Sequence, residues 1–169
     1  MMKKIILTAL CLSLSVMYFS GIAYSSDEVV YKCQEQLLQK YPNVEAIKKQ
    51  FGAEAKWQEE TQPSIHDDTL ELQIKNMEYP GIEIGTLGYA WEGEYRFFIT
   101  SLDVKKAGFV TFLGLDVGSA RGEVIKTFGN PQEIDGNELI YHDEAEYTYI
   151  IFTIEKNNIA EMKFVNYLD

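Results

Sequence analysis

The side chains of this chain that could act as nucleophiles or bases do not form a catalytic motif. Cys33 with His66 or His142 could supply a thiol–imidazole pair, and Ser101 or Ser119 could supply a hydroxyl nucleophile. Neither serine lies in a G-x-S-x-G or S-x-x-K sequence, the spacings that position and activate a catalytic serine. We therefore predict that the protein is not an enzyme, and we expect no cofactor.

Each histidine is followed by two acidic residues, in the stretches 66–68 (His-Asp-Asp) and 142–144 (His-Asp-Glu). Imidazole and carboxylate groups are suitable ligands for a divalent cation. No H-x-x-x-H type of ligand spacing accompanies them, so we predict no metal site. Without a metal, the two stretches would be polar residues at equivalent positions, each at the start of a strand, in two repeats. The sequence leaves open whether a cation binds near His66 or His142.

The glycine-rich stretch Gly114 to Pro131 could be either a phosphate-binding loop or a capped helix. The phosphate patterns G-x-x-x-x-G-K-[ST] and G-x-G-x-x-G are both absent. Ser119 stands where a helix N-cap belongs, Gly129 can end the helix, and Pro131 prevents its continuation. Apolar residues recur every four positions between these signals, at Ala120, Val124 and Phe128. This spacing predicts a short helix.

Two more helices are predicted near the start of the mature chain. Residues 26–41 have a serine cap and two acids in the first turn, and Pro42 ends the pattern. Asn43 then caps a second helix over 44–52, which ends in a glycine. Cys33 lies on the apolar stripe of the first helix, so we expect a buried, inert thiol.

From Thr69 onward, apolar residues alternate with polar ones, which predicts strands. We predict seven of them, over 69–75, 81–91, 95–104, 108–117, 138–144, 147–156 and 159–168. The breaks between them are short, so neighbouring strands should be antiparallel. The predicted fold is α+β with two layers, in which short helices pack on one face of an antiparallel sheet.

Two parts of the chain share a helix-then-strands pattern. Ile47-x-x-x-Phe51-Gly52 matches Val124-x-x-x-Phe128-Gly129, so we expect both phenylalanines to be buried under the sheet. The single domain 26–169 would then contain a first repeat over 26–115, with an insertion near 69–94, and a second repeat over 116–169.

The second of these parts resembles a known family. Its residues Gly118-Ser119, Val124, Phe128-Gly129, Pro131 and Tyr141 are similar to the signature of the BamE/SmpA/OmlA outer-membrane assembly lipoproteins. The tandem arrangement is similar to that of the β-lactamase inhibitory proteins. The resemblance implies a module whose helices cover one sheet face and whose other face binds proteins. The chain departs from the lipoproteins because it has no lipid-attachment cysteine and is about one repeat longer.

Residues 1–25 are predicted to be a secretory signal peptide. Two lysines precede an apolar run, and small residues at 23 and 25 suit cleavage between Ala23 and Ser26. The alternative is an uncleaved anchor helix, since about 20 apolar residues can span a bilayer. Neither Cys11 nor Cys33 fits a lipid-attachment site, so we expect no lipid anchor. The expected location is the periplasm or the medium.

The composition is strongly acidic. The net charge of −11 becomes about −13 once Lys3 and Lys4 are removed with the signal segment. Such a surface repels phosphate backbones, so we expect no nucleic acid partner, whereas a basic protein or a cation is compatible with it. Cys33 would be the sole cysteine of the mature chain, which excludes an internal disulfide. The sequence does not give the oligomeric state.

Aromatic residues are concentrated in the stretch 88–98. Period two would place them on both sides of a strand pair, although a two-layer fold buries only one side. We predict that Tyr89 and Trp91 point away from the helices and bind a protein, with Glu92 and Glu94 as a charged rim. The predicted function is a secreted, non-catalytic protein-interaction module of the bacterial cell envelope. The alternatives are an inhibitor or immunity protein against a secreted enzyme, and a carrier of a small ligand or cation.

Overall fold

The computed structural model describes residues 26–52, 56–64, 67 and 69–168, and in these residues the fold is α+β. Three helices are present: α1 (Ser26–Lys40), α2 (Val44–Phe51) and α3 (Arg121–Phe128). The strands are β1 (Lys56–Pro63), β2 (Glu71–Tyr79), β3 (Ile82–Trp91), β4 (Glu94–Val104), β5 (Glu133–Asp135), β6 (Glu138–His142), β7 (Thr148–Glu155) and β8 (Asn158–Asn166). None of the three helices has both the length and the hydropathy that a bilayer span requires. The predicted signal segment lies outside the described residues.

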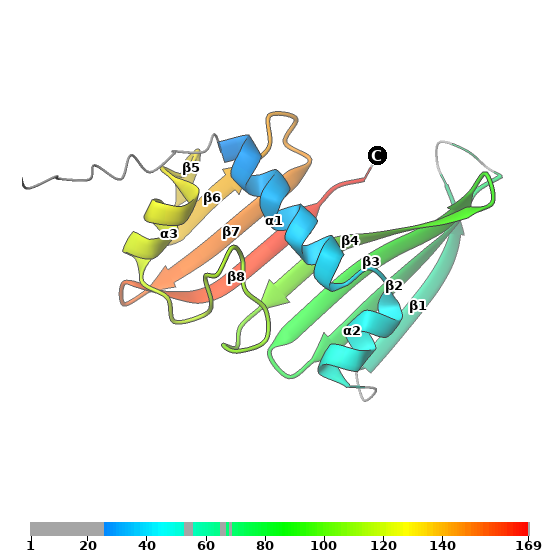
Figure 1. Cartoon of the computed structure of the whole chain (residues 1–169), viewed down its shortest axis with the longest axis horizontal. Helices are drawn as coiled ribbons and strands as arrows, with labels where there is room; N and C mark the ends of the chain where they lie inside the picture. The colour runs from blue at the N-terminus through cyan, green and yellow to red at the C-terminus, as the bar shows by residue number, and fades with distance from the viewer. Residues whose placement is uncertain (1–25, 53–55, 65–66, 68, 169) are drawn as a thin grey trace, which may run out of the picture.

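The eight strands form one antiparallel sheet in the order β1-β2-β3-β4-β8-β7-β6-β5. Each half of the sheet is a four-stranded meander that follows a helix, and the last strands of the two meanders pair with each other in the middle (Figure 1). Since β4 and β8 have neighbours on both sides, the free edges of the sheet are β1 and β5.

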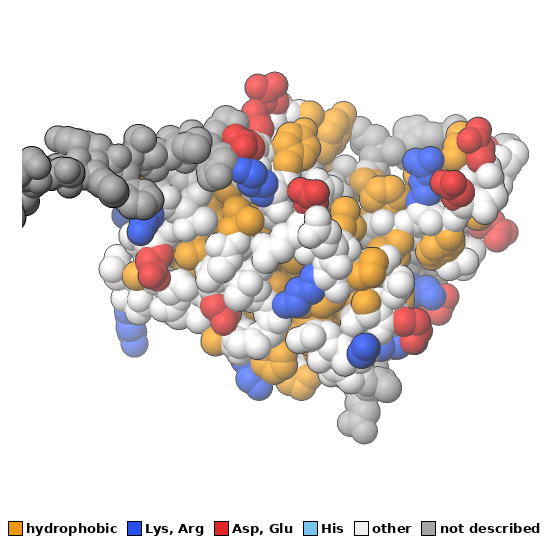
Figure 2. All heavy atoms as spheres, in the orientation of Figure 1, with side chains coloured by type: hydrophobic (Ala, Val, Ile, Leu, Met, Phe, Trp, Pro, Cys, Tyr) orange, Lys and Arg blue, Asp and Glu red, His pale blue; other side chains and the backbone are white. Residues whose placement is uncertain are grey.

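The helices lie on one face of the sheet (Figure 1). The ring of Phe51, in the last turn of α2, lies 5.2 Å from that of Tyr79 on β2. Phe128, in the last turn of α3, lies 5.1 Å from Tyr141 on β6 and 5.0 Å from Phe152 on β7. Helix α1 contacts β4, β6 and β7 between them. The core therefore fills the space between the helices and this face. Seen from the helix side, the surface of the molecule mixes hydrophobic and charged side chains (Figure 2).

The two predicted phenylalanines differ in burial. Phe128 is 1% exposed, whereas Phe51 is partly buried and packs against the rim of the core. The difference arises because α2 covers the edge of the sheet, where β1 is exposed along its whole length. Of the two rings expected to be buried, Phe128 is fully buried, whereas Phe51 is buried only in part.

The helix ends follow from local hydrogen bonds. The side chain of Asn43 accepts a bond from the N–H of Ala46 at 2.9 Å, as an N-cap does. The predicted cap of α3, Ser119, is one residue too early, because its Oγ accepts the N–H of Asp116 at 3.1 Å. The N-cap is Ala120, whose N–H donates to the Glu123 carboxylate at 3.0 Å. That carboxylate also suits the positive end of the helix dipole.

The predicted strand over 108–117 is wrong. This segment is a loop with one bridge between Phe112 and Leu115. It packs under α1, where Gln36 accepts the N–H of Leu113 at 3.0 Å and Val110 is fully buried. A strand after β4 would have no edge to join, because both neighbours of β4 are already in place. The apolar residues of the segment are therefore buried in the core although the segment does not pair with a strand of the sheet.

The other six predicted strands are present, and two strands were missed. Strand β1 escapes the period-two rule because all eight of its side chains are exposed, so neither face carries an apolar signal. Strand β5 is only three residues long and equally exposed. Both are edge strands, which are held mainly by main-chain pairing with one neighbour.

Candidate functional site

The sheet face opposite the helices, which we call the open face, carries an apolar groove at one end. Side chains alternate along β3, so Ile82 and Ile84 join the core while Leu87, Tyr89 and Trp91 point to the open face. We call this feature the aromatic groove, and its volume is about 560 Å³. Its apolar lining comes from the end of β1, the residue before β2, the strands β2, β3 and β4, and the C-terminal segment: Pro63, Leu70, Leu72, Leu87, Tyr89, Trp91, Phe98 and Leu168.

Two aromatic side chains form the wall of the aromatic groove. The rings of Tyr89 and Phe98 are stacked at 5.9 Å with an angle of 16° between their planes. Trp91 stands beside them and is 38% exposed. Large aromatic side chains that are packed on one side and open on the other suit contact with a partner. The structure thus places Tyr89 and Trp91 on the face opposite the three described helices.

The rim of the aromatic groove is polar and partly acidic. Glu92 and Gly93 form the tight turn between β3 and β4, both with positive φ, and Glu94 follows them in an exposed position. Asp67 lies on the opposite rim, where its Oδ1 accepts the hydroxyl of Thr69 at 2.6 Å and the N–H of Thr69 at 2.9 Å. These bonds hold the pKa of Asp67 below its usual value.

A polar depression adjoins the aromatic groove on the open face. Gly85 on β3 pairs with Asn76 on β2 and with Ser101 on β4. A side chain at position 85 would collide with the Ser101 hydroxyl and would crowd the Thr100 hydroxyl and the amide oxygen of Asn76. Gly85 and Ser101 both line the depression, which has a volume of about 250 Å³, and the close approach of the Ser101 hydroxyl favours glycine at position 85. A glycine inside a strand often marks a close approach by another backbone.

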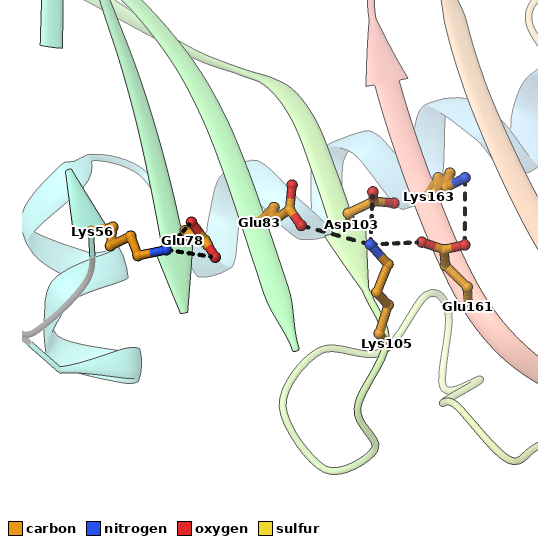
Figure 3. A network of polar contacts seen from close by, with 7 residues as sticks. All are labelled: Lys56, Glu78, Glu83, Asp103, Lys105, Glu161 and Lys163. Atoms are coloured by element: carbon orange, nitrogen blue, oxygen red, sulfur yellow. Dashed lines mark hydrogen bonds and ion pairs between the residues drawn. The ribbon is translucent and has the colours of Figure 1, made fainter. Parts of the chain in front are cut away.

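Beyond the depression, three acidic side chains stand next to one another on adjacent strands. Glu78 on β2 pairs directly with Glu83 on β3, and Glu83 pairs directly with Asp103 on β4. We call these three residues the acidic row. Figure 3 shows them on the side of the sheet away from α1. Like charges directly opposite each other on a sheet are destabilising.

Lysines around the acidic row balance it only in part. Lys56 on β1 pairs with Glu78 and lies 3.3 Å from its carboxylate (Figure 3). Lys105 lies 3.6 Å from Glu83, 3.8 Å from Asp103 and 3.3 Å from Glu161, so one cation is shared by three carboxylates (Figure 3). Burial, followed by the charge of Glu161, raises the pKa of Asp103. The hydrogen bond to Glu161 in turn raises the pKa of Lys105. The side chains of Glu78 and Glu83 are 55% and 61% exposed and remain accessible to a partner.

The residues first considered for catalysis do not meet in the described structure. Cys33 is fully buried on α1, and burial raises the pKa of its thiol. His142 ends β6, where its Nδ1 lies 2.8 Å from the carbonyl of Asp143. Ser101 lies on the open face of β4, and Ser119 closes the turn before α3. The stretch 66–68 is described only at Asp67, so its relation to His142 lies outside the described residues.

In the glycine-rich stretch before α3, main-chain donors bond to other parts of the fold. The N–H of Gly118 donates to the carbonyl of Ile159 at 2.8 Å, and the N–H of Arg121 donates to the main-chain carbonyl of Asn157 at 3.0 Å. These bonds attach the start of α3 to the β7–β8 turn. Among the described residues, no group of three histidine, cysteine, aspartate or glutamate side chains is placed to hold a metal ion.

Sequence reasoning found part of this site and missed the rest. The aromatic cluster in 88–98 pointed to Tyr89 and Trp91. Phe98 belongs to the same cluster, whereas Leu70 and Leu168 were not foreseen, since they come from other parts of the chain and nothing local marks them. The acidic row was missed for the same reason, because it depends on the pairing of three strands. No protein-family profile, curated protein or solved structure matches this chain.

Proposed function

We propose that the protein is a secreted, non-catalytic protein-interaction module of the bacterial cell envelope that binds its partner on the open face. The observation that carries the proposal is the aromatic groove, where Tyr89, Trp91 and Phe98 meet on a sheet face without helices. Tyrosine and tryptophan side chains are enriched among the residues that dominate binding energy. Glu92 and Glu94 at the tip of the hairpin add negative charge, which favours a basic partner and speeds association at low salt.

Similar contacts in the two halves of the sheet support this proposal. Phe51 packs on Tyr79 of β2 at 5.2 Å, and Phe128 packs on Tyr141 of β6 at 5.1 Å, with a glycine after each phenylalanine. Strands β2 and β6 hold the same place in their meanders. We infer that the two halves are copies of one helix-then-strands unit. Tyr79 of the first copy then corresponds to Tyr141 of the second, whereas the sequence comparison had matched the stretches that begin at His66 and His142. The longer strands of the first half account for part of its extra residues, and α1 accounts for another part.

Two copies joined through β4 and β8 make a sheet wide enough to receive a folded partner. This is the arrangement implied by the resemblance to the β-lactamase inhibitory proteins and to the BamE/SmpA/OmlA family. A component of the envelope or a secreted enzyme is therefore the class of partner that we propose, and in the latter case the protein would act as an inhibitor or immunity protein. The resemblance supports the fold more strongly than the partner, because its signature consists of caps and core residues.

The test is capture from an envelope extract by the immobilised mature chain, followed by cross-linking mass spectrometry. The double variant Tyr89→Ala, Trp91→Ala should lose the partner, since truncation of such anchors commonly costs at least about 2 kcal/mol each. Its thermal midpoint should stay close to that of the unchanged protein, because Trp91 is 38% exposed and Tyr89 is half-buried. Tyr31→Ala is the control, as this tyrosine is 56% exposed on α1, in the helix layer.

The outcome separates binding from folding. Unchanged capture by the double variant would place the interaction on another surface. Unfolding of the double variant would show that these aromatic side chains belong to the core. Cross-links that map to α1 rather than to β2, β3 and β4 would contradict the assignment to the open face.

A small apolar ligand is a second candidate, favoured by the size of the aromatic groove. Its volume of about 560 Å³ falls within the range of roughly 300 to 1,000 Å³ that ligand pockets occupy. Native mass spectrometry of protein purified from its own compartment tests this function. A bound species that Trp91→Ala loses would favour the carrier.

A further inference from the structure

The open face presents three features in line along the strands. The aromatic groove lies around Leu87 and Tyr89, the polar depression lies at Gly85, and the acidic row crosses β3 at Glu83. Leu87, Gly85 and Glu83 are spaced by two residues, so all three positions share one face of β3. The features therefore form a continuous track rather than three separate surfaces.

The arrangement of the acidic row lowers the stability of the fold. Glu78, Glu83 and Asp103 are direct neighbours across three strands, and like charges in that position are destabilising. Lys56 forms an ion pair with Glu78 at 3.3 Å, Lys163 pairs with Asp103 across the strands, and Lys105 is shared among three carboxylates. These lysines relieve the repulsion only in part, and a cationic group of a partner would relieve it further. Charge complementarity thus assigns a basic side chain of the partner to this end of the track.

The middle of the track suits a polypeptide backbone. The depression at Gly85 is bordered by the hydroxyls of Ser101 and Thr100 and by the side-chain amide of Asn76, which can donate or accept hydrogen bonds. A residue with a larger side chain at position 85 would fill this space. An extended segment that crosses here could bond its main chain to these groups while its side chains reach the two ends.

The spacing follows from strand geometry. Leu87 and Glu83 are four residues apart, and a strand rises about 3.3 Å per residue, which gives roughly 13 Å along the face. From Tyr89 to Glu83 the separation is six residues, or roughly 20 Å. An extended partner segment has the same rise, so its two recognised side chains should be four to six residues apart.

Resting on the function proposed above, we propose that the occupant of the open face is an extended segment of a basic partner protein. The segment places an apolar or aromatic side chain in the aromatic groove and a lysine or arginine, four to six residues away, on the acidic row. A second copy of this chain is a poor occupant, because both open faces would bring their acidic rows together and the mature net charge is about −13.

A peptide selection tests the proposal and does not require the partner to be identified first. Phage-displayed random linear peptides are selected on the immobilised mature protein, and enriched peptides are synthesised and titrated by fluorescence polarisation. We expect enriched sequences to pair an apolar or aromatic residue with a lysine or arginine at the stated spacing. Glu78→Gln with Glu83→Gln should weaken them at least about fivefold and make the Kd less dependent on salt.

The matched control is Glu35→Gln with Glu45→Gln, which changes the net charge equally but on α1 and α2. It should leave peptide affinity unchanged. The double variant Glu78→Gln, Glu83→Gln should keep its thermal midpoint, because loss of the exposed ion pairs with Lys56 and Lys105 is offset by removal of the like-charge pair. Lost binding could then not be ascribed to unfolding. Replacement of Gly85 by serine should weaken the same peptides by filling the depression.

The results distinguish this inference from the proposed function. Enriched peptides that lose binding in Trp91→Ala but have no basic residue at the stated spacing would overturn the inference and leave the proposed function intact. Selected peptides that bind Trp91→Ala as tightly as they bind the unchanged protein would contradict both the inference and the proposed function. A dimer in sedimentation equilibrium that Trp91→Ala lacks would assign the open face to a second copy and overturn the inference.

Discussion

Truncation of Phe128 to alanine tests how the second half of the fold is held together. The side chain is 1% exposed, and its ring lies within 5.1 Å of those of Tyr141 and Phe152. Phenylalanine-to-alanine changes in a packed core cost about 3–5 kcal/mol, through lost transfer free energy and the cavity left behind. A domain with an ordinary stability of about 5–15 kcal/mol would lose a large part of it.

Phe51→Ala is the matched comparison, because Phe51 holds the corresponding place at the end of α2. Its ring contacts Tyr79 at 5.2 Å and Tyr41 at 5.6 Å, but the side chain is only partly buried. We expect about 2–3 kcal/mol here, since a partly exposed ring gains less transfer free energy on folding. The structure therefore predicts a smaller loss for Phe51 than for Phe128.

Urea denaturation, followed by tryptophan fluorescence and far-ultraviolet circular dichroism, measures both changes. The two probes should give coincident transitions, and the slope of free energy against urea should be unchanged, so that midpoints report stability. A cost below about 1 kcal/mol for Phe128→Ala would refute the packing of α3 on β6 and β7. A larger cost for Phe51→Ala than for Phe128→Ala would refute the burial argument.

The end of α3, the acidic row, the core thiol and the signal segment each give a further prediction. Gly129→Ala should cost about 1–2 kcal/mol in urea denaturation, because φ at this helix end is 80° and only glycine adopts it freely. Asp103→Asn should raise the thermal midpoint at pH 7, since burial and Glu161 raise the pKa of Asp103 and its ionised form is therefore disfavoured in the fold. This gain should vanish below about pH 3.9, where the carboxyl is protonated in the folded and the unfolded chain. Cys33 should react with a thiol reagent only at the rate of unfolding, because it is fully buried. Intact-mass measurement of exported protein should show cleavage within residues 23–26, and a full-length mass in the membrane pellet would favour an anchor.

The helices were predictable because each has its own stop and start signals within a few residues. Pro42 and Gly52 bound α2, and Gly129 ends α3 with its N–H on the carbonyl of Ile125 at 2.9 Å. These interactions are local, so the sequence alone displays them. Strand β1 shows the reverse, since its eight exposed residues take their conformation from pairing with β2. The loop 108–117 misled the alternation rule because its apolar residues are buried without a strand partner.

The candidate site depends on one irregularity that alternation does not show. Gly85 pairs with Ser101, but the next residue of β3, Thr86, pairs with Ile99, so Thr100 is an extra residue in β4. The bulge reverses which side chains of β4 face the core.

Without the bulge, the alternation set by Leu102 and Val104 would turn Phe98 toward the helices and Ile99 outward. With it, Phe98 stacks on Tyr89 while Asp103 still faces Glu83. Buried residues at 99, 102 and 104 break the spacing of two once, and this break is the sequence signal of the bulge. Phe98 and Asp103 are five residues apart, an odd spacing that regular alternation would place on opposite faces, so the aromatic groove and the acidic row share one face because of that single extra residue.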